Sequence, residues 1–411
     1  MCGIVGYVGP KNAVPLLIEG LKRLEYRGYD SCGVAVRQAD GALAIRKRVG
    51  RLSNLEEALE AAPLAGGLGI GHTRWATHGE PSEINSHPHL DCAGRIAVVH
   101  NGIIENYQAL RAELEAKGHV FRSQTDTEVL PHLIGEVLKQ GGCSPVEAIR
   151  AALRQAKGAY ALGIVFRDEP GVLYAARCGS PLIVGVGAGE QFIASDVPAI
   201  LNRVKQVIYL NDGEVAELRP EGVAVSKLDG TPVAPEIKSV TLRAEAAERA
   251  GFETFMLKEI HEQPRVLRAL LDAHVGKDGA VDLGEAEALV AAQAKTAQRI
   301  LILSCGTAYY AGMYGRLVLE RWTGIPCETD LGSEFRYRGP RLPADTLAIA
   351  VSQSGETADT LASVRLARDM GCQVLGICNV PGSTLLRESD AALLTQAGPE
   401  IGVASTKAFT A

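Results

Sequence analysis

The sequence predicts two domains: an α+β domain of antiparallel sheets sandwiched by helices, then an α/β domain with a doubly wound parallel sheet. The length of 411 residues exceeds what one hydrophobic core usually serves. Up to about residue 227, short β-branched runs follow one another with few helices between them, which is typical of antiparallel sheets. From residue 251 onward strand, loop and helix patterns alternate, which is typical of a parallel sheet.

The first domain is expected to span residues 1–227. Apolar and β-branched runs predict strands at 2–8, 33–36, 68–72, 95–100, 159–166, 172–176, 182–186 and 206–210. Apolar residues at helical spacing predict helices at 13–24, 106–117, 127–139 and 145–157, the third starting after Asp126. Residues 228–250 are polar and irregular, with Pro232 and Pro235, and we interpret them as a linker.

The second domain is expected to span residues 251–411. Buried strands are predicted at 299–304, 346–351, 373–378 and 391–394, with helices at 308–322 and 357–369. The sequence stops at Ala411, just after a predicted helix start, where a helix would be too short to cover its sheet. We therefore expect a chain that is incomplete at its C-terminus.

Composition and charge argue against several classes of protein. A net charge of -6 gives no general attraction to nucleic acid or to anionic membranes. The nine cysteines are odd in number and include no CxxC pair, so neither a disulfide framework nor a zinc ribbon is expected. The sequence shows no signal peptide and no apolar run long enough to span a bilayer. These observations predict a cytoplasmic protein.

Cys2 is a candidate nucleophile because of its position in the opening MCGIVG. Methionine before a small residue is normally removed in the cell, which would leave Cys2 with a thiol and a free α-amino group. An α-amino group has a pKa of about 7.7–8.0, so it can act as a general base near neutral pH. One residue would then supply nucleophile and base. The alternative is a small buried residue at the start of a strand.

Several motifs of the first domain carry a family resemblance. They are MCGIVGY (1–7), EYRGYDS (25–31), GHTRWATHG (71–79), NSHPH (85–89), HNGIIEN (100–106) and SQTDTE (123–128). In this order they resemble the class II glutamine amidotransferases, which have an Ntn-hydrolase fold. The forms at 25–31 and 100–106 are similar to those of the glutamine:fructose-6-phosphate amidotransferases.

The resemblance implies that Cys2 attacks the side-chain amide of glutamine. The side-chain amide of Asn101 and the backbone N–H of Gly102 would form the oxyanion hole. Both donors are neutral, which suits a negative charge that exists only in the tetrahedral intermediate. The structural alternative for Asn101 and Gly102 is a hairpin turn.

The resemblance also implies a set of glutamine-binding residues. Arg74 would bind the substrate α-carboxylate, and Asp126 would bind the α-ammonium. Thr77 and His78 would add contacts, while Trp75 would close the pocket and help retain ammonia. As alternatives, Arg74 could be a surface cation and Asp126 a helix N-cap.

Histidines are concentrated in one short part of the first domain, at positions 72, 78, 87, 89 and 100. No cysteine or carboxylate at ligand spacing accompanies them, so structural hydrogen bonding is favoured over zinc binding. We therefore expect no metal and no cofactor.

Three strand-to-helix turns of the second domain carry hydroxyl groups, at 305–307, 352–357 and 403–406. In a parallel sheet all three lie along the carboxyl edge, where ligands bind. Hydroxyls and backbone N–H groups at a helix N-terminus form a suitable site for phosphate. Serine and threonine are also ordinary N-caps, so each turn alone is weak support.

The motifs CGTAYYAG (305–312), SEFRYR (333–338), SQSGETADT (352–360) and EIGVASTKAFT (400–410) resemble the first sugar isomerase module of the same family. The resemblance implies a fructose 6-phosphate site made of Thr307, Ser352, Gln353, Ser354 and Thr357, with Val403 and Ser405 lining the sugar. Ala308 departs from the family, since many members have serine there, and one contact with the substrate would be lost. The imine lysine and the acid/base residues of the family lie in a second module that we do not expect in this chain, and Lys407 is not that lysine.

The two resemblances together predict transfer of amide nitrogen from L-glutamine to fructose 6-phosphate by a homodimer. By itself the chain is expected to be a glutaminase with a partial sugar-phosphate site. One alternative is another class II amidotransferase, serving purine or asparagine synthesis, but the SQSGET motif argues against it. The other is a non-catalytic sugar-phosphate sensor, which would leave the Cys2 motifs without a role.

Overall fold

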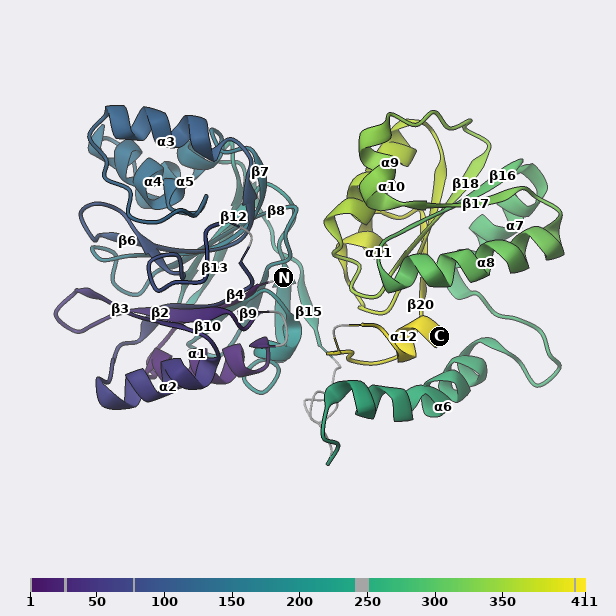
Figure 1. Cartoon of the computed structure of the whole chain (residues 1–411), viewed down its shortest axis with the longest axis horizontal. Coiled ribbons are helices and arrows are strands. Elements are labelled where there is room, and N and C mark those ends of the chain that lie inside the picture. Colours follow the sequence, from purple (N-terminus) through teal and green to yellow (C-terminus); the bar gives the residue numbers. More distant parts are fainter. Residues whose placement is uncertain (1, 26–27, 77, 241–250, 403) are drawn as a thin grey trace. The chain divides into compact units, whose positions relative to one another are not determined.

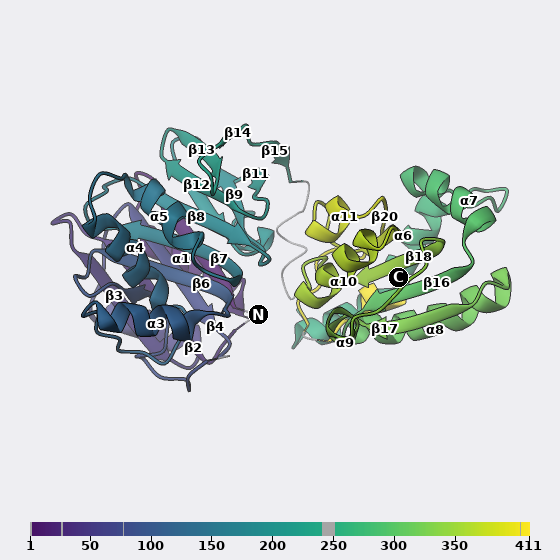
Figure 2. The same cartoon turned by 90° about the horizontal axis from the view of Figure 1, so that it is seen from above.

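The computed structural model describes residues 2–25, 28–76, 78–240, 251–402 and 404–411. The chain divides into two compact units, Met1–Ala244 and Glu245–Ala411, whose elements are drawn in Figure 1 and Figure 2. The division falls inside the expected linker 228–250. Two short strands of that segment pair within the sheets of the first unit, so its beginning belongs to that unit.

The first unit contains two antiparallel sheets, as the sequence predicts. The first sheet has the spatial order β15 (Ile237–Ser239), β11 (Gln206–Tyr209), β9 (Ile183–Val186), β10 (Gln191–Ala194), β1 (Gly3–Val8), β4 (Leu68–Arg74), β2 (Ser31–Arg37) and β3 (Leu43–Val49). The second sheet has the order β14 (Pro232–Val233), β13 (Gly222–Lys227), β12 (Glu214–Arg219), β8 (Leu173–Cys178), β7 (Gly158–Phe166), β6 (Ile96–Ile104) and β5 (His89–Leu90).

Helices cover the outer faces of both sheets, giving four layers. Helices α1 (Ala13–Lys22) and α2 (Leu52–Ala61), with the short η2 (Val197–Ala199), share a core with the first sheet. Helices α3 (Tyr107–Ala116), α4 (Val129–Lys139) and α5 (Pro145–Leu153) share another with the second sheet. A third core lies between the sheets.

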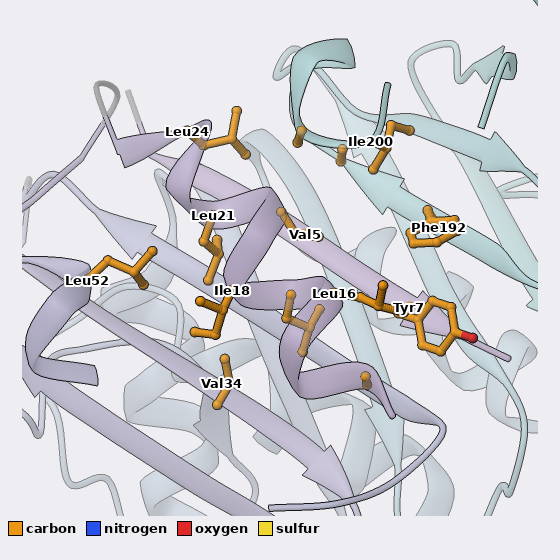
Figure 3. Close-up of a cluster of buried hydrophobic side chains, with 14 of the residues drawn as sticks. Val5, Tyr7, Leu16, Ile18, Leu21, Leu24, Val34, Leu52, Phe192 and Ile200 are labelled. Carbon is orange, nitrogen blue, oxygen red and sulfur yellow. The ribbon is translucent and has the colours of Figure 1, made fainter. Parts of the chain in front are cut away.

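Strand β1 shows how the sequence builds these layers, because successive side chains of a strand point to opposite faces. Val5 and Tyr7 belong to the core beneath α1, where Figure 3 shows Tyr7 beside Phe192. Ile4 and Val8 belong to the core between the two sheets. The strand is therefore buried on both faces, and its first residue, Gly3, follows Cys2 directly.

The second unit contains a parallel sheet in the order β17 (Cys327–Leu331), β16 (Arg299–Ser304), β18 (Thr346–Ser352), β19 (Gln373–Cys378) and β20 (Ala391–Leu394). Side chains of α7 (Glu287–Thr296) and α8 (Thr307–Thr323) pack on one face. Those of α9 (Gly332–Arg338), α10 (Ala358–Asp369) and α11 (Thr384–Glu388) pack on the other. This is the predicted doubly wound architecture.

The remaining helices of the second unit are α6 (Phe255–His274), η4 (Gly284–Ala286) and α12 (Lys407–Thr410). Helix α12 is tied to α6 by an ion pair of 2.6 Å between Lys407 Nζ and Glu262 Oε2. In the described part of the chain, no helix combines the length and apolar character needed to cross a bilayer.

Candidate active site

Cys2 lies where the start of β1 meets the end of β4. In the antiparallel pair Gly3 is opposite Thr73, so Arg74 and Trp75 continue from β4 past Cys2. The backbone N–H of Trp75 donates to Cys2 Sγ at 3.2 Å. The register of two central strands therefore brings the start of the chain and the GHTRWATHG motif together, as the predicted site requires.

Asn101 connects Cys2 to the second sheet. It lies on β6, and its Nδ2 donates to the backbone oxygen of Cys2 at 2.9 Å. His72 Nε2 lies 3.0 Å from Asn101 Oδ1 and 3.1 Å from the oxygen of His100. Both oxygens only accept, so His72 carries its proton on Nε2. This hydrogen bond directs the NH₂ group of Asn101 toward Cys2.

Gly102 occupies a backbone position that a larger residue cannot adopt. Its φ is 136°, and a Cβ atom there would lie 2.0 Å from the backbone oxygen of Ala159. Residues 101–104 continue β6, with Gly102 opposite Tyr160 of β7. The hairpin-turn alternative for Asn101 and Gly102 is therefore wrong, because the strand runs on for four residues beyond its predicted end at 100.

The environment of Cys2 keeps its thiol protonated, so a base is needed to form the thiolate. Burial raises the pKa of the Cys2 thiol, and the N–H of Trp75 offsets this only in part. The thiol is therefore protonated near neutral pH. A nucleophilic role for Cys2 accordingly requires a neighbouring general base.

Arg74 is buried, with 3% of its surface exposed, so the surface-cation alternative is wrong. Its guanidinium donates to the backbone oxygens of His78, of Gly79 at 3.1 Å and of Glu80 at 3.4 Å. Burial lowers the pKa of Arg74, but arginine stays protonated in proteins. The cation shapes the loop that follows Trp75, and His78 in that loop packs edge-on against Tyr107, with ring centroids 5.5 Å apart.

Asp126 is also buried, and its Oδ2 accepts the backbone N–H of Ile104 at 2.8 Å. Helix α4 begins at Val129, with Glu128 at the N-cap position, so Asp126 is not the cap and that alternative is wrong. Its carboxylate instead fixes the end of β6, just beyond Gly102. Trp75 is 45% exposed and packs edge-on against Tyr29. Thr77 lies outside the described residues.

Asp30 is a positioning residue that belongs to the EYRGYDS motif but for which the sequence predicted no role. Its backbone N–H donates to the oxygen of Arg74 at 3.2 Å, and its Oδ2 accepts the N–H of Ala76. The carboxylate therefore holds the segment that carries Arg74 and Trp75 beside Cys2. No local sequence pattern reveals this role, because the contact joins residues 46 positions apart.

Four histidines of the first unit form a buried network: His72, His87, His89 and His100. Burial lowers the pKa of His72 to about 3 and depresses those of His87, His89 and His100. The hydroxyl of Thr127 lies 2.9 Å from His87 Nε2 and 2.8 Å from His100 Nδ1. These neutral rings link β4, β6 and the segment before α4, which stabilises the site.

The carboxyl edge of the parallel sheet gathers the predicted sugar-phosphate residues of the second unit. The sheet order changes direction between β16 and β18, which is where ligands bind in such folds. A small cavity of about 40 Å³ at this edge is lined by Ser352, Gln353 and Ser405, and also by Ala308. Thr307 is the first residue of α8, next to that lining. Val403 lies outside the described residues.

The loop after β18 arranges its hydroxyls around the N-terminus of α10. Ser352 Oγ accepts the N–H of Gly355 at 3.0 Å and lies 3.4 Å from Thr357 Oγ1. Ser354 Oγ accepts the N–H of Glu356 at 3.2 Å. Thr357 is the N-cap residue of α10 and makes no side-chain cap bond. Ser354 and Thr357 therefore lie in the loop but do not line the cavity.

Two polar residues that line this cavity were not predicted from the sequence. Asn379 and Thr395 line the cavity, and Thr395 Oγ1 donates to Asn379 Oδ1 at 3.1 Å. Ser405, which was predicted, donates to Glu400 Oε2 at 2.7 Å, so a carboxylate shapes the loop after β20. Asn379 directly follows the predicted strand at 373–378, and that position at the carboxyl edge was the signal available.

Known proteins resemble this chain in sequence and in fold. The glutamine amidotransferase domain family matches residues 72–202, and the SIS domain family matches residues 295–411. Glutamine–fructose-6-phosphate aminotransferase (isomerizing) of Symbiobacterium thermophilum is 53% identical over 100% of this chain and 67% of its own length. The proteins of that name from Streptomyces coelicolor and Thermus thermophilus are 51% and 52% identical over 100% of this chain, and over 66% and 67% of their own lengths.

Among solved structures, the glutamine phosphoribosylpyrophosphate amidotransferase of B. subtilis matches 95% of this chain and 90% of its own. The TM-score is 0.50 and the sequence identity is 19%, so this likeness concerns the fold alone.

Proposed function

Because the chain belongs to the family of glutamine–fructose-6-phosphate aminotransferases (isomerizing), we propose that it releases ammonia from L-glutamine at Cys2 for transfer to D-fructose 6-phosphate. The products of the complete reaction are D-glucosamine 6-phosphate and L-glutamate. The observation that carries the proposal is the meeting of Cys2, the Trp75 backbone and the Asn101 amide, where the start of β1, the end of β4 and the second half of β6 come together.

The first chemical step uses the amine of processed Cys2. After removal of Met1, this amine takes the proton of the Cys2 thiol, and the sulfur attacks the δ-carbonyl carbon of glutamine. The C=O electron pair moves to oxygen, whose charge is stabilised by Asn101 Nδ2 and the N–H of Gly102. The protonated amine then gives its proton to the leaving nitrogen, so ammonia departs and a thioester remains for hydrolysis.

The substrate backbone is held by charges on both sides of the thiol. Arg74 pairs with the α-carboxylate and Asp126 with the α-ammonium of glutamine, while Thr77 and His78 add contacts. Trp75, which is partly exposed and whose backbone contacts Cys2, covers the bound substrate and limits escape of ammonia into water. Support comes from the burial of Arg74 and Asp126 close to the strand ends that carry Cys2 and Gly102.

The sugar phosphate binds at the carboxyl edge of the parallel sheet in the second unit. Ser352, Ser354 and Thr357 contact the phosphate at the N-terminus of α10, and Gln353 and Thr307 complete the site. Val403 and Ser405 line the sugar. By analogy with the family, the working enzyme is a cytoplasmic homodimer that needs no cofactor.

The pH dependence of glutamine hydrolysis should follow the α-amine of Cys2. Because burial raises the pKa of the thiol, the group that titrates first is the amine, with a pKa of about 7.7–8.0 in water. The value of kcat/KM is expected to rise with pH through this range and to level off above it. A profile that does not change between about pH 6 and pH 9 would count against the amine as base.

Binding of fructose 6-phosphate should raise the melting temperature of the second unit, whereas phosphoribosyl pyrophosphate should have little effect. In the Ser352→Ala variant, about tenfold more fructose 6-phosphate should be needed for the same rise in melting temperature. The reason is that a charge-assisted hydrogen bond contributes roughly 1.5 kcal/mol. A Ser389→Ala variant, outside the cavity, is the control. Preference for phosphoribosyl pyrophosphate would favour another class II amidotransferase instead.

A further inference from the structure

The first unit holds a cluster of three potential metal ligands apart from the glutamine site. Cys92 lies in the turn between β5 and β6, His119 follows α3, and His132 lies on α4. Cys92 Sγ is 3.5 Å from His132 Nδ1 and 3.9 Å from His119 Nδ1, and the two Nδ1 atoms are 3.3 Å apart. Distances of about 3.6 Å for sulfur to nitrogen and about 3.3 Å for nitrogen to nitrogen are those of a tetrahedral zinc ion.

A hydrogen bond to Glu136 fixes the orientation of the His119 ring in this cluster. His119 Nε2 lies 2.9 Å from Glu136 Oε2, and because a carboxylate only accepts, Nε2 carries the proton. His132 Nε2 lies 3.6 Å from Glu128 Oε1, beyond hydrogen-bond distance, and has no other hydrogen-bond partner among the described residues. With its proton on Nε2, His119 presents the lone pair of Nδ1, which faces His132 Nδ1 at 3.3 Å. A cation between Sγ and the two Nδ1 atoms would be bound by the lone pairs of all three atoms.

The surroundings favour a cation with a thiolate ligand. Glu128 and Glu136 are carboxylates behind the two rings, and metal-binding histidines typically donate their other ring N–H to such a group. The backbone N–H of Val120 donates to Cys92 Sγ at 3.3 Å, which stabilises a negative sulfur. The side chains of His119 and His132 are buried, whereas Cys92 is exposed.

A cleft of about 820 Å³ gives access to the cluster, and Cys92 and His132 are part of its lining. An ion held by Cys92, His119 and His132 would have one position left, open toward the cleft. Three protein ligands with one open position are a common zinc arrangement.

We propose that Cys92, His119 and His132 form a binding site for a divalent transition-metal ion of the zinc class, with Sγ and the two Nδ1 atoms as ligands. Binding displaces the thiol proton to solvent and forms three coordinate bonds without any redox change. The ion joins the β5–β6 turn, the segment after α3, and α4. No metal was predicted from the sequence because the histidines at 72–100 lack a cysteine or carboxylate at ligand spacing. The three ligands proposed here were not considered together, since they are 27 and 13 residues apart and match no familiar spacing.

The test is titration of the whole chain with Co²⁺ and Zn²⁺ after removal of metal with a chelator. Bound Co²⁺ should show a thiolate charge-transfer band in the near ultraviolet, with one ion per chain, and Zn²⁺ should displace it. The Cys92→Ser variant should lose the band, whereas Cys143→Ser, a partly buried cysteine of the same unit, should keep it. Zn²⁺ should also raise the melting temperature of the wild type and of Cys143→Ser, but not of Cys92→Ser.

A second variant separates ligation from folding. Glu136→Gln leaves all three ligands in place and should weaken Zn²⁺ binding by about tenfold or more, because the partner of His119 Nε2 loses its charge. The proposal is overturned if the wild type shows no cobalt–thiolate band. It is equally overturned if Cys92→Ser binds the ion as tightly as Cys143→Ser does. A Zn²⁺ effect that disappears only in a Cys2→Ala variant would assign the ion to the glutamine site and contradict the proposal.

Discussion

The Cys2→Ala variant is expected to lose glutamine hydrolysis by about 10⁴-fold or more in kcat, because no other group replaces the sulfur nucleophile. Methionine removal still occurs before alanine, so the variant keeps the α-amine and loses only the thiol. The main-chain oxygen of residue 2 still accepts from Asn101, and the fold should be unchanged. Initial rates of glutamate formation check the prediction.

The matched control for this variant is Cys143→Ser. Cys143 is a partly exposed cysteine of the same unit that packs at the edge of the core under α3, α4 and α5, with its Sγ 4.0 Å from the oxygen of Val137. It should keep normal turnover and normal circular dichroism. Comparable glutaminase rates in Cys2→Ala and in the wild type would show that hydrolysis uses a different nucleophile.

Replacing Asn101 by alanine is expected to lower kcat for glutamine hydrolysis by about 10²–10³-fold, or roughly 2.7–4 kcal/mol, with little change in KM. The reason is that Asn101 Nδ2 stabilises a charge that exists only after attack by Cys2. Steady-state kinetics separate the two parameters. Labelling of Cys2 by a glutamine-analogue electrophile that forms no oxyanion should continue, since the nucleophile is intact.

The Asn101→Asp variant distinguishes an electrostatic role from a steric one. Aspartate has nearly the same shape as asparagine but removes the NH₂ donor and places an anion at the oxyanion site. It should therefore be at least as impaired as Asn101→Ala. An Asn101→Asp variant with turnover close to the wild type would leave Asn101 with only a structural role, supporting the backbone of Cys2.

The central strands of both units could be predicted because they are apolar and bounded by turn residues. Strand β3 was missed because Arg46, Lys47 and Arg48 make it look like a polar loop. Helix α2 was missed as well, since its N-cap Arg51 provides no capping bond. In both cases tertiary contacts with the first sheet stabilise a segment whose local pattern is weak.

In the candidate site, motifs identified the residues but not the contacts between them. The predicted positions of Cys2, Arg74 and Asn101 come together because β1, β4 and β6 bring distant segments side by side. The roles of Asp30 and His72 depend on pairing across sheets, which no single segment of sequence encodes. The chemical roles of Cys2, Arg74 and Asn101, like those of Thr77 and Val403, are predictions.

The most direct measurement is mass spectrometry of the purified active chain before and after reaction with a glutamine-analogue electrophile such as a diazoketone. Met1 is expected to be absent, and one label per chain is expected to be incorporated, on Cys2. Full glutaminase activity in protein that still carries Met1, or labelling at another cysteine, would contradict this expectation.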